Sequence, residues 1–258
     1  MEEDNEVHKM VDNTTDKKAD VKSLLSVIIP TYNEENNIEA SIMQIVKQVN
    51  SKNKGDWRVE ILVVDDGKDK TAQIAEQVGK KVNSNQCTLQ VHHSSEKRGK
   101  GGAFVYGLGK AKGDVILIMD GDLTIGGNEI PYLVNPIFNR KVDFVNGTRF
   151  IHEMEAGAMS FTNKLGNKIF AFMTSLALRM WFTDVFCGCK AFRREMLAGK
   201  LNEKEWPDLE LLFKARRNGL RIMEVPVHYH KRLAGESKVT ASGTGLVLFK
   251  SFLRNLFN

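Results

Sequence analysis

Short apolar segments rich in Val, Ile and Leu alternate with segments of helical periodicity along much of this 258-residue chain. Such alternation restricts the choice of fold strongly, because parallel strands need a long crossover connection that is usually a helix. Helices that connect parallel strands cover both faces of the sheet. We therefore predict an α/β fold with a mostly parallel sheet. The predicted strands are residues 24–30, 59–66, 88–93, 114–119 and 142–147, with a final strand within 220–229.

Polar clusters follow three of the predicted strands, at the point where each strand ends. The cluster "PTYNEE" follows the first strand, "DDGKDKT" overlaps the end of the second, and "DGD" follows the fourth. In parallel α/β sheets, ligands bind beyond the carboxyl ends of the strands. The three clusters are therefore predicted to form one site at one edge of the sheet.

The "DGD" cluster places Asp120 and Asp122 two residues apart, with Gly121 between them. In an extended or turning backbone, residues i and i+2 point the same way, so both carboxylates face one spot. Two like charges there are unfavourable unless a cation lies between them, and Mg²⁺ or Mn²⁺ prefers such oxygen ligands. We predict a divalent metal site. It is not an EF-hand, because Ile125 and Pro131 replace the required Gly and Glu.

Other motifs and the composition exclude several classes of protein. The segment "RGKGGAF" resembles a dinucleotide fingerprint, but Phe104 stands in place of the third Gly and no strand precedes it. There is no Walker sequence, and aromatic residues do not alternate with basic ones, so no nucleic-acid partner is expected. A net charge of +5 suits nucleotide phosphates or an anionic membrane surface. Three cysteines and no signal peptide indicate a cytosolic protein with reduced thiols.

These observations fit a nucleoside diphosphate sugar as the ligand. A carboxylate such as Asp66 can accept a hydrogen bond from a base N–H. A metal held by Asp120 and Asp122 can bridge the two phosphates and stabilise the diphosphate as it leaves. The expected chemistry is therefore a displacement at the anomeric carbon of a sugar.

Several motifs together resemble the family 2 glycosyltransferases, which are inverting enzymes with a nucleotide-binding sheet called the GT-A fold. These motifs are "SVIIPTYNEENNI", "ILVVDDGKDKT", "KRGKGGAF", "MDGDL" and "NGTRF". The later "DVFCGCKAFRRE", "PDLELLFKARRNGLRIMEVPVHYHKR" and "GESK" are similar to those of dolichyl- or polyprenyl-phosphate mannose or glucose synthases. The resemblance covers residues 24–240.

The resemblance implies roles for particular residues. Asp120 and Asp122 would be metal ligands and catalytic residues, and Arg232 a third catalytic residue that closes with Lys238 over the donor and acceptor phosphates. The motif "DDGKDKT" is one residue shorter than the usual form, which leaves Asp69 without a firm counterpart. The implied nucleotide-sugar-binding residues are Pro30, Tyr32, Glu34, Val64, Asp66, Asp120, Gly121, Asp122, Arg149, Arg232 and Lys238.

The implied reaction transfers a hexose from a nucleotide sugar, GDP-mannose or UDP-glucose, to a polyprenyl or dolichyl phosphate with inversion. A phosphate acceptor already carries an ionised oxygen, so no general base is required, and the roles of Asp208 and Glu210 stay open. Two alternatives remain. One is a glycosyltransferase acting on a sugar or protein hydroxyl, although "RLAGESK" stands where processive members carry Q-x-x-R-W. The other is a nucleotide-sugar-binding protein without catalysis.

The chain is expected to comprise a disordered tail at 1–22, a catalytic domain at 23–240 and an amphipathic helix at 241–258. No apolar run reaches the roughly 20 residues of a membrane-spanning helix. A lipid acceptor nonetheless implies a peripheral protein on the cytosolic face of a membrane, the endoplasmic reticulum in a eukaryote or the plasma membrane in a bacterium. Its amphipathic helices or a membrane-spanning partner subunit would hold it there. The apolar face of a helix at 161–182 is predicted to contain Phe170, Met173, Leu176, Ala177 and Met180, and that of the C-terminal helix Leu246, Phe249, Leu253, Leu256 and Phe257.

Overall fold

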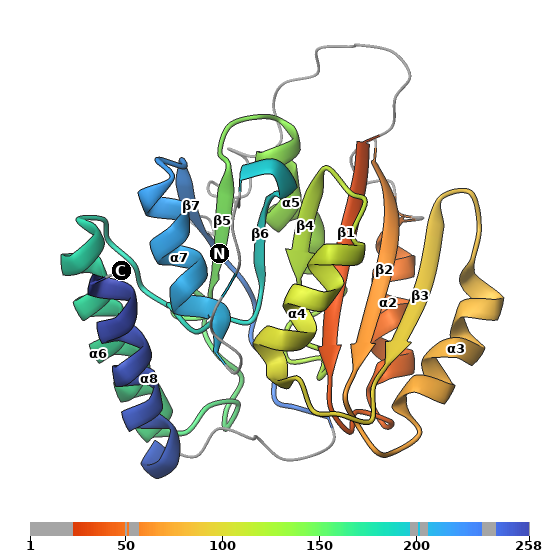
Figure 1. The fold of residues 1–258 in the computed structure, drawn as a ribbon, viewed down its shortest axis with the longest axis horizontal. Coiled ribbons are helices and arrows are strands. Elements are labelled where there is room, and N and C mark those ends of the chain that lie inside the picture. Colours follow the sequence, from red (N-terminus) through yellow and green to blue (C-terminus); the bar gives the residue numbers. More distant parts are fainter. Residues whose placement is uncertain are drawn as a thin grey trace.

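The computed structural model describes residues 23–49, 51, 57–196, 201, 206–233 and 241–257. The predicted tail at 1–22 and the predicted phosphate-binding Lys238 lie outside these residues. Within them, seven strands form one sheet in the order β3-β2-β1-β4-β6-β5-β7. Figure 1 shows this sheet with helices on both of its faces. The predicted α/β fold is therefore confirmed.

Each predicted strand is present, and most of the sheet is parallel. The strands are β1 (Ser23–Thr31), β2 (Trp57–Asp65), β3 (Cys87–His93), β4 (Val115–Ile118), β5 (Phe144–Thr148) and β7 (Ile222–Pro226). One further strand was not predicted: β6 (Lys190–Arg193) inserts antiparallel between β4 and β5. This strand has only four residues, and two of them are charged, so it lacks the apolar run that marks the others.

The helices form two layers. On one face of the sheet lie α2 (Ile38–Val49), α3 (Thr71–Val82) and α5 (Ile130–Phe138), and on the other lie α4 (Gly99–Lys110), α6 (Phe161–Leu178), α7 (Pro207–Arg217) and α8 (Ala241–Phe257). Short 3₁₀ turns occupy η1 (Gly127–Glu129) and η2 (Arg194–Met196). Successive residues of a strand point to opposite faces of the sheet, and each face has its own hydrophobic core. Val63 packs in the core beneath α2, α3 and α5, whereas Leu62 and Val64 pack in the core beneath α4, α6, α7 and α8.

The parallel strands bring the predicted polar clusters to one edge of the sheet. The register pairs Thr31, at the end of β1, with Asp65, at the end of β2. The loop after β4 packs on the same edge, because a Cβ added to Gly121 would lie 3.1 Å from Thr31 Cγ2. Glycine at position 121, which has no side chain, therefore lets this loop lie close against β1. We call the loop, which contains Asp120 and Asp122, the acidic loop.

The helix predicted at 161–182 exists as α6, but its solvent-facing side differs from the prediction. Of the predicted apolar face, Phe170, Met173, Ala177 and Met180 pack against the core, and only Leu176 is exposed. Residues spaced three or four apart share one side of a helix. The exposed apolar side, which we call the α6 stripe, contains Phe161, Leu165, Ile169, Phe172 and Leu176.

The C-terminal helix α8 packs against α6 and α7 at one end of the sheet (Figure 1). Its buried side includes Phe252, whose ring meets Phe213 of α7 with centroids 5.9 Å apart. The predicted Leu253 also packs on the core, whereas the other predicted apolar residues are exposed: Leu246, Phe249, Leu256 and Phe257. No helix in the described part of the chain has the length and apolar character needed to cross a membrane.

Candidate active site

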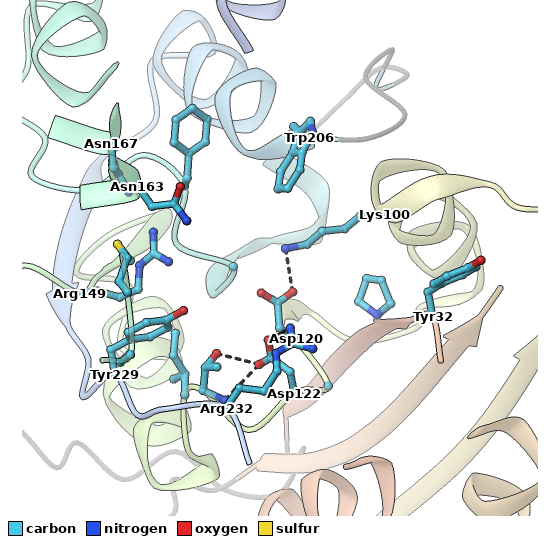
Figure 2. Close-up of a pocket in the computed structure, with 18 of the residues that line it drawn as sticks. Tyr32, Lys100, Asp120, Asp122, Arg149, Asn163, Asn167, Trp206, Tyr229 and Arg232 are labelled. Carbon is cyan, nitrogen blue, oxygen red and sulfur yellow. Dashed lines mark hydrogen bonds and ion pairs between the residues drawn. The ribbon is translucent and has the colours of Figure 1, made fainter. Parts of the chain in front are cut away.

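A cavity of about 790 Å³ opens at the carboxyl edge of β1, β2 and β4. Volumes of this order are usual for sites that bind small molecules. Figure 2 shows side chains from distant parts of the chain around it. Val64 does not reach it, because its side chain is fully buried in the core beneath α4. The predicted residues that line the cavity are Pro30, Tyr32, Glu34, Asp66, Asp120, Gly121, Asp122, Arg149 and Arg232.

Asp120 and Asp122 lie in the loop after β4, and each contacts a different cation. Asp120 Oδ1 lies 2.7 Å from Lys100 Nζ, and Asp122 Oδ2 lies 2.5 Å from Arg232 Nη2 (Figure 2). Burial, which removes water from around the carboxylate, would by itself raise the pKa of Asp120. The positive charges of Lys100, Arg149 and Arg232 outweigh this effect and hold the pKa of Asp120 below its ordinary value. Asp120 is therefore a carboxylate at neutral pH.

Lys100 was not predicted as a site residue. It lies in the first turn of α4, directly after Gly99, whose φ of +74° is in the left-handed region that glycine tolerates. Burial would lower the pKa of Lys100, but the charge of Asp120 raises it on balance, so the amino group stays protonated. The segment "RGKGGAF" fails as a dinucleotide fingerprint, yet its first glycine allows a lysine to begin a helix at the cavity.

Arg232 joins two of the three polar clusters. It follows β7, but its guanidinium reaches Glu34 in the loop after β1, with Nη1 3.2 Å from Oε1, and Asp122 in the loop after β4. These partners are 198 and 110 positions away in the sequence. Arg232 therefore holds the segment after β7 against the acidic loop, at the position where the motifs imply a cation near phosphate.

Asp66, the predicted partner of the base, is held by Arg98. Its two oxygens accept hydrogen bonds from the backbone N–H and the Nε–H of Arg98, both at 2.7 Å. The guanidinium of Arg98 in turn lies 4.6 Å from the ring centroid of Tyr106. An ionised carboxylate has about four acceptor positions, so Asp66 can accept a further hydrogen bond from a ligand.

Arg149 lines the cavity and is fixed by the buried Asp184. Its Nε and Nη2 donate to the two carboxylate oxygens of Asp184 at 2.6 and 2.9 Å, and Asn167 of α6 donates to the same carboxylate. The guanidinium lies 5.1 Å from the ring centroid of Tyr229. Burial opposes its charge, but Asp184 more than compensates and raises the pKa of Arg149. Arg149 is thus a fixed positive charge in the cavity wall.

Asp208 lies in a buried ion pair and does not line the cavity. Lys190 Nζ, whose side chain is 0% exposed, donates to Asp208 Oδ1 at 2.7 Å and to the Cys187 carbonyl at 2.6 Å. The pair joins the start of α7 to β6. Glu210 is also buried, 3.6 Å from the amino group of Lys214 in the next turn of α7. Both acids therefore serve the packing of α7 in this structure.

The pair of Asp120 and Asp122 fits a hard divalent cation by the chemistry of its oxygens. Among the residues that the structure describes, no three His, Cys, Asp or Glu side chains group as a metal site. A metal at this pair would take its other ligands from water or from phosphate oxygens, as Mg²⁺ commonly does. It would also compete with Lys100 and Arg232 for the carboxylates.

Comparison with known proteins places this molecule among the glycosyltransferases. The family described as "Glycosyl transferase family 2" has a sequence model that matches residues 26–199, about two thirds of the chain. The chain belongs to this family.

Relatives with curated names include a dolichol-phosphate mannosyltransferase of Pyrococcus furiosus, 31% identical over 238 residues that cover 90% of this chain and 62% of the relative. A UDP-N-acetylglucosamine–dolichyl-phosphate N-acetylglucosaminyltransferase of Methanococcus voltae is 30% identical over 250 residues, which cover 90% of this chain and 95% of the relative. The glycosyltransferase AglD of Haloferax volcanii is 29% identical, matching 83% of this chain and 34% of its own length. The chain thus spans less than two thirds of the Pyrococcus and Haloferax proteins.

A solved structure with a similar fold is glucosyl-3-phosphoglycerate synthase from Mycobacterium tuberculosis, with a TM-score of 0.68 and 21% identity. The match covers 91% of this chain and 78% of the synthase, whose structure contains Mn²⁺, UDP and phosphoglyceric acid. A further structure of the synthase contains Mg²⁺ and UDP. At this identity the likeness concerns the fold alone, and it confirms the predicted GT-A fold.

Proposed function

We propose that this glycosyltransferase transfers a hexose from GDP-mannose or UDP-glucose to a polyprenyl or dolichyl phosphate. The transfer inverts the anomeric carbon and uses Mg²⁺ or Mn²⁺. The names of the Pyrococcus and Methanococcus relatives support a dolichyl phosphate acceptor. The metal ion and UDP bound to the mycobacterial synthase support the metal and the nucleotide sugar.

The observation that carries the proposal is that each carboxylate lining the cavity in the described residues is paired with a cation. A hydroxyl acceptor needs a general base to remove its proton, and a carboxylate held by Arg or Lys is a weak base. A phosphate acceptor brings an oxygen that is already ionised, so it needs none. The pairs are Glu34 and Asp122 with Arg232, Asp66 with Arg98, and Asp120 with Lys100.

The charges in the cavity also suit two anionic substrates. Five cationic side chains and four carboxylates line it, so a divalent ion would leave three positive charges. The diphosphate of a nucleotide sugar carries two negative charges, and an acceptor phosphate carries at least one. Both substrates can therefore be neutralised together. The cationic residues are Lys97, Lys100, Arg149, Lys231 and Arg232.

In the proposed reaction, an oxygen of the acceptor phosphate attacks the anomeric carbon from the side opposite the diphosphate. The bond from that carbon to the diphosphate oxygen breaks as the new bond forms, so the configuration inverts and the nucleoside diphosphate leaves. A bound divalent ion supplies Lewis-acid stabilisation of the leaving group. Asp120 and Asp122 would hold that ion, and Arg232, positioned by Glu34, would face the phosphates.

The proposal is tested by incubating the purified chain with a panel of nucleotide sugars and a polyprenyl phosphate. We expect one hexosyl lipid, identified by its mass, and no product in EDTA. Product on a sugar or peptide hydroxyl, and none on the lipid phosphate, would support the hydroxyl-acceptor alternative. Binding of a nucleoside diphosphate with metal, but no transfer to any acceptor, would support a binding protein without catalysis.

We also propose that the protein works at the cytosolic face of a membrane, held by its own surface or by a membrane-spanning partner subunit. The α6 stripe and the exposed apolar residues of α8 support this location. Helices with an apolar face and basic side chains lie in membrane interfaces, and salt weakens their attraction to anionic lipids. The basic residues on or beside these helices are Lys164, Lys168, Arg179, Lys250 and Arg254.

Replacing Leu165, Phe172 and Leu176 together with Ser is expected to weaken binding to anionic vesicles by at least about tenfold. Burying each such side chain contributes on the order of 1.5–3 kcal/mol, and even partial insertion of three exceeds the 1.4 kcal/mol of a tenfold change. Sedimentation with vesicles at low salt measures the effect. Met43→Ser, at an exposed apolar position of α2 on the other face of the sheet, is the matched control. Unchanged sedimentation of the triple variant would exclude the α6 stripe as the contact.

A further inference from the structure

The loop before β6 contains the short motif "CGC", and the glycine of this motif, Gly188, lines the cavity beside Asp120. A Cβ built on Gly188 would have the Asp120 carboxyl group as its three nearest atoms, with Oδ2 at 1.9 Å, Cγ at 2.6 Å and Oδ1 at 3.0 Å. The φ of Gly188 is not in the left-handed region, so the backbone itself does not require glycine here. One carboxylate oxygen of Asp120 therefore occupies the space that a side chain at position 188 would fill.

The position of Gly188 is fixed by its neighbours in the motif. Cys187 and Cys189 are completely buried, and the Cys189 carbonyl accepts a hydrogen bond from the backbone N–H of Gly147 in β5 at 3.0 Å. A Cβ built on Gly147 would lie 2.9 Å from Cys187 Sγ, so little space remains between the loop and β5. Lys190 Nζ also donates to the Cys187 carbonyl at 2.6 Å. The loop therefore has little room to move away from the cavity.

The backbone on both sides of Asp120 is fixed as well. The N–H of Met119, which is buried, donates to the Ile28 carbonyl of β1 at 3.1 Å. Gly121 packs closely on Thr31, also of β1. A side chain changes rotamer more easily than a close-packed backbone segment shifts. A methyl group at position 188 would therefore displace the side chain of Asp120 and leave both loops in place.

The Asp120 carboxylate lies between Lys100 and Gly188. Its Oδ1 is 2.7 Å from Lys100 Nζ (Figure 2), and its Oδ2 lies against the glycine. Displacement would change this ion pair and the alignment of the carboxylate with that of Asp122. Mg²⁺ requires nearly ideal ligand geometry, so two carboxylates share such an ion only when both are correctly placed.

We propose that Gly188 is a positioning residue of the active site. Its lack of a side chain leaves the space in which the Asp120 carboxylate lies beside Asp122, ready to hold a divalent ion. Gly188 acts only through Asp120 and is not a metal ligand. This inference rests on the proposed function, because it takes Asp120 and Asp122 as the residues that hold the metal.

Gly188→Ala tests the proposal by adding a single methyl group. Gly166→Ala is the matched control, because Gly166 of α6 lines the same cavity and a Cβ there would meet no atom within 4 Å. Calorimetric titration measures the binding of GDP and of UDP, once with Mn²⁺ and once in EDTA. Thermal unfolding measures the stability of each variant, and hexosyl transfer gives kcat.

We expect Gly188→Ala to weaken Mn²⁺-dependent binding of the nucleoside diphosphate by about 10- to 100-fold and to lower kcat by a similar factor. Groups that orient a metal ligand typically have effects of this size. Binding in EDTA should stay within about twofold, because the added methyl group leaves contacts such as that of Asp66 unchanged. The melting temperature should fall by less than about 4 °C, since only one side chain has to move. Gly166→Ala should change none of these quantities.

A second pair of variants identifies the group that moves. Asp120→Ala removes Oδ2, Cγ and Oδ1, the three atoms nearest to the added methyl group. Adding Gly188→Ala to Asp120→Ala should therefore not lower the melting temperature further. A fall of more than about 8 °C caused by Gly188→Ala both with and without Asp120→Ala would show that the loop before β6 is strained, and it would overturn the proposal.

The remaining outcomes separate this inference from the proposed function. If Gly188→Ala binds the nucleoside diphosphate with Mn²⁺ as tightly as the unmodified protein, or loses equal affinity with and without Mn²⁺, the positioning role is wrong and the proposed function still stands. If Mn²⁺ does not increase nucleotide binding to the unmodified protein, the metal-binding part of the proposed function fails, and the inference fails with it. A selective loss of Mn²⁺-dependent binding in Gly188→Ala supports the positioning role.

Discussion

Replacing Asp120 or Asp122 with Asn is expected to lower kcat by at least about a thousandfold. Removing one charge-stabilising group from an active site typically costs two to three powers of ten, and these residues are proposed both to hold the metal and to keep two cations in place. Lys100 and Arg232 would each lose an anionic partner at 2.7 and 2.5 Å. The rate of hexosyl-lipid formation measures the effect, and calorimetric titration of a nucleoside diphosphate with and without Mn²⁺ measures metal-dependent binding.

Asp114→Asn provides the matched control for these two variants. Asp114 is exposed and directly precedes β4, at the end opposite Asp120, so the same substitution there changes the same strand without touching the cavity. Its rate should stay close to that of the unmodified protein. Full activity of the Asp120 and Asp122 double variant, or turnover in EDTA, would refute the metal-binding role of the pair.

Asp208→Asn is expected to show the opposite pattern, with a large loss of stability and a retained rate. Asp208 is 4% exposed, and its partner Lys190 is completely buried. Removing one partner of a buried ion pair costs about 3–5 kcal/mol. We expect about 3 kcal/mol here, because the Cys187 carbonyl still accepts a hydrogen bond from Lys190. Denaturant unfolding measures the free energy of unfolding, and kcat below the melting temperature should stay within about tenfold of the unmodified protein.

The rate of Asp208→Asn also distinguishes a hydroxyl acceptor from a phosphate acceptor. If Asp208 removed a proton from an acceptor hydroxyl, its loss would lower the rate by about 10²–10⁴. Unchanged stability with a rate that falls by that amount would therefore contradict both the structural role of Asp208 and the phosphate acceptor. Lys214→Gln, which removes the longer 3.6 Å contact to the buried Glu210 on the same helix, is the comparison variant. It should cost less stability than Asp208→Asn, because the Lys214 side chain is partly exposed and its amino group is farther from the carboxylate than that of Lys190 is from Asp208.

The main features of the fold were predictable because they depend on local patterns. Runs such as residues 59–66 are apolar and β-branched because a strand buried on both faces contacts helices on both sides. The acidic pair was equally visible, since Asp120 and Asp122 are neighbours in sequence. The rule that ligands bind at the carboxyl edge of a parallel sheet then placed "PTYNEE", "DDGKDKT" and "DGD" together.

Residues whose partners are distant in the sequence were harder to predict. Lys100 was missed because its partner, Asp120, belongs to another element, and nothing in "RGKGGAF" by itself indicates that contact. The ion pair of Arg149 with Asp184 depends on two loops that meet only in the folded protein. Strand β6 escaped prediction because pairing with β4 and β5, and not its own composition, makes it a strand.

The sequence alone determined that this protein has a mostly parallel α/β sheet and an acidic loop at its carboxyl edge. Both follow from the spacing of apolar and charged residues, which is set by the geometry of strands and helices. Only the tertiary structure decided which cation meets each carboxylate, and which side of α6 faces solvent. Arg232 forms an ion pair with Glu34, which is 198 positions away in the sequence. In α6, Phe170 faces the core and Phe172 faces solvent, because α8 and the loop before β6 cover one side of the helix. Helical periodicity shows that a helix has an apolar face, but the neighbours that cover that face are set by the whole fold.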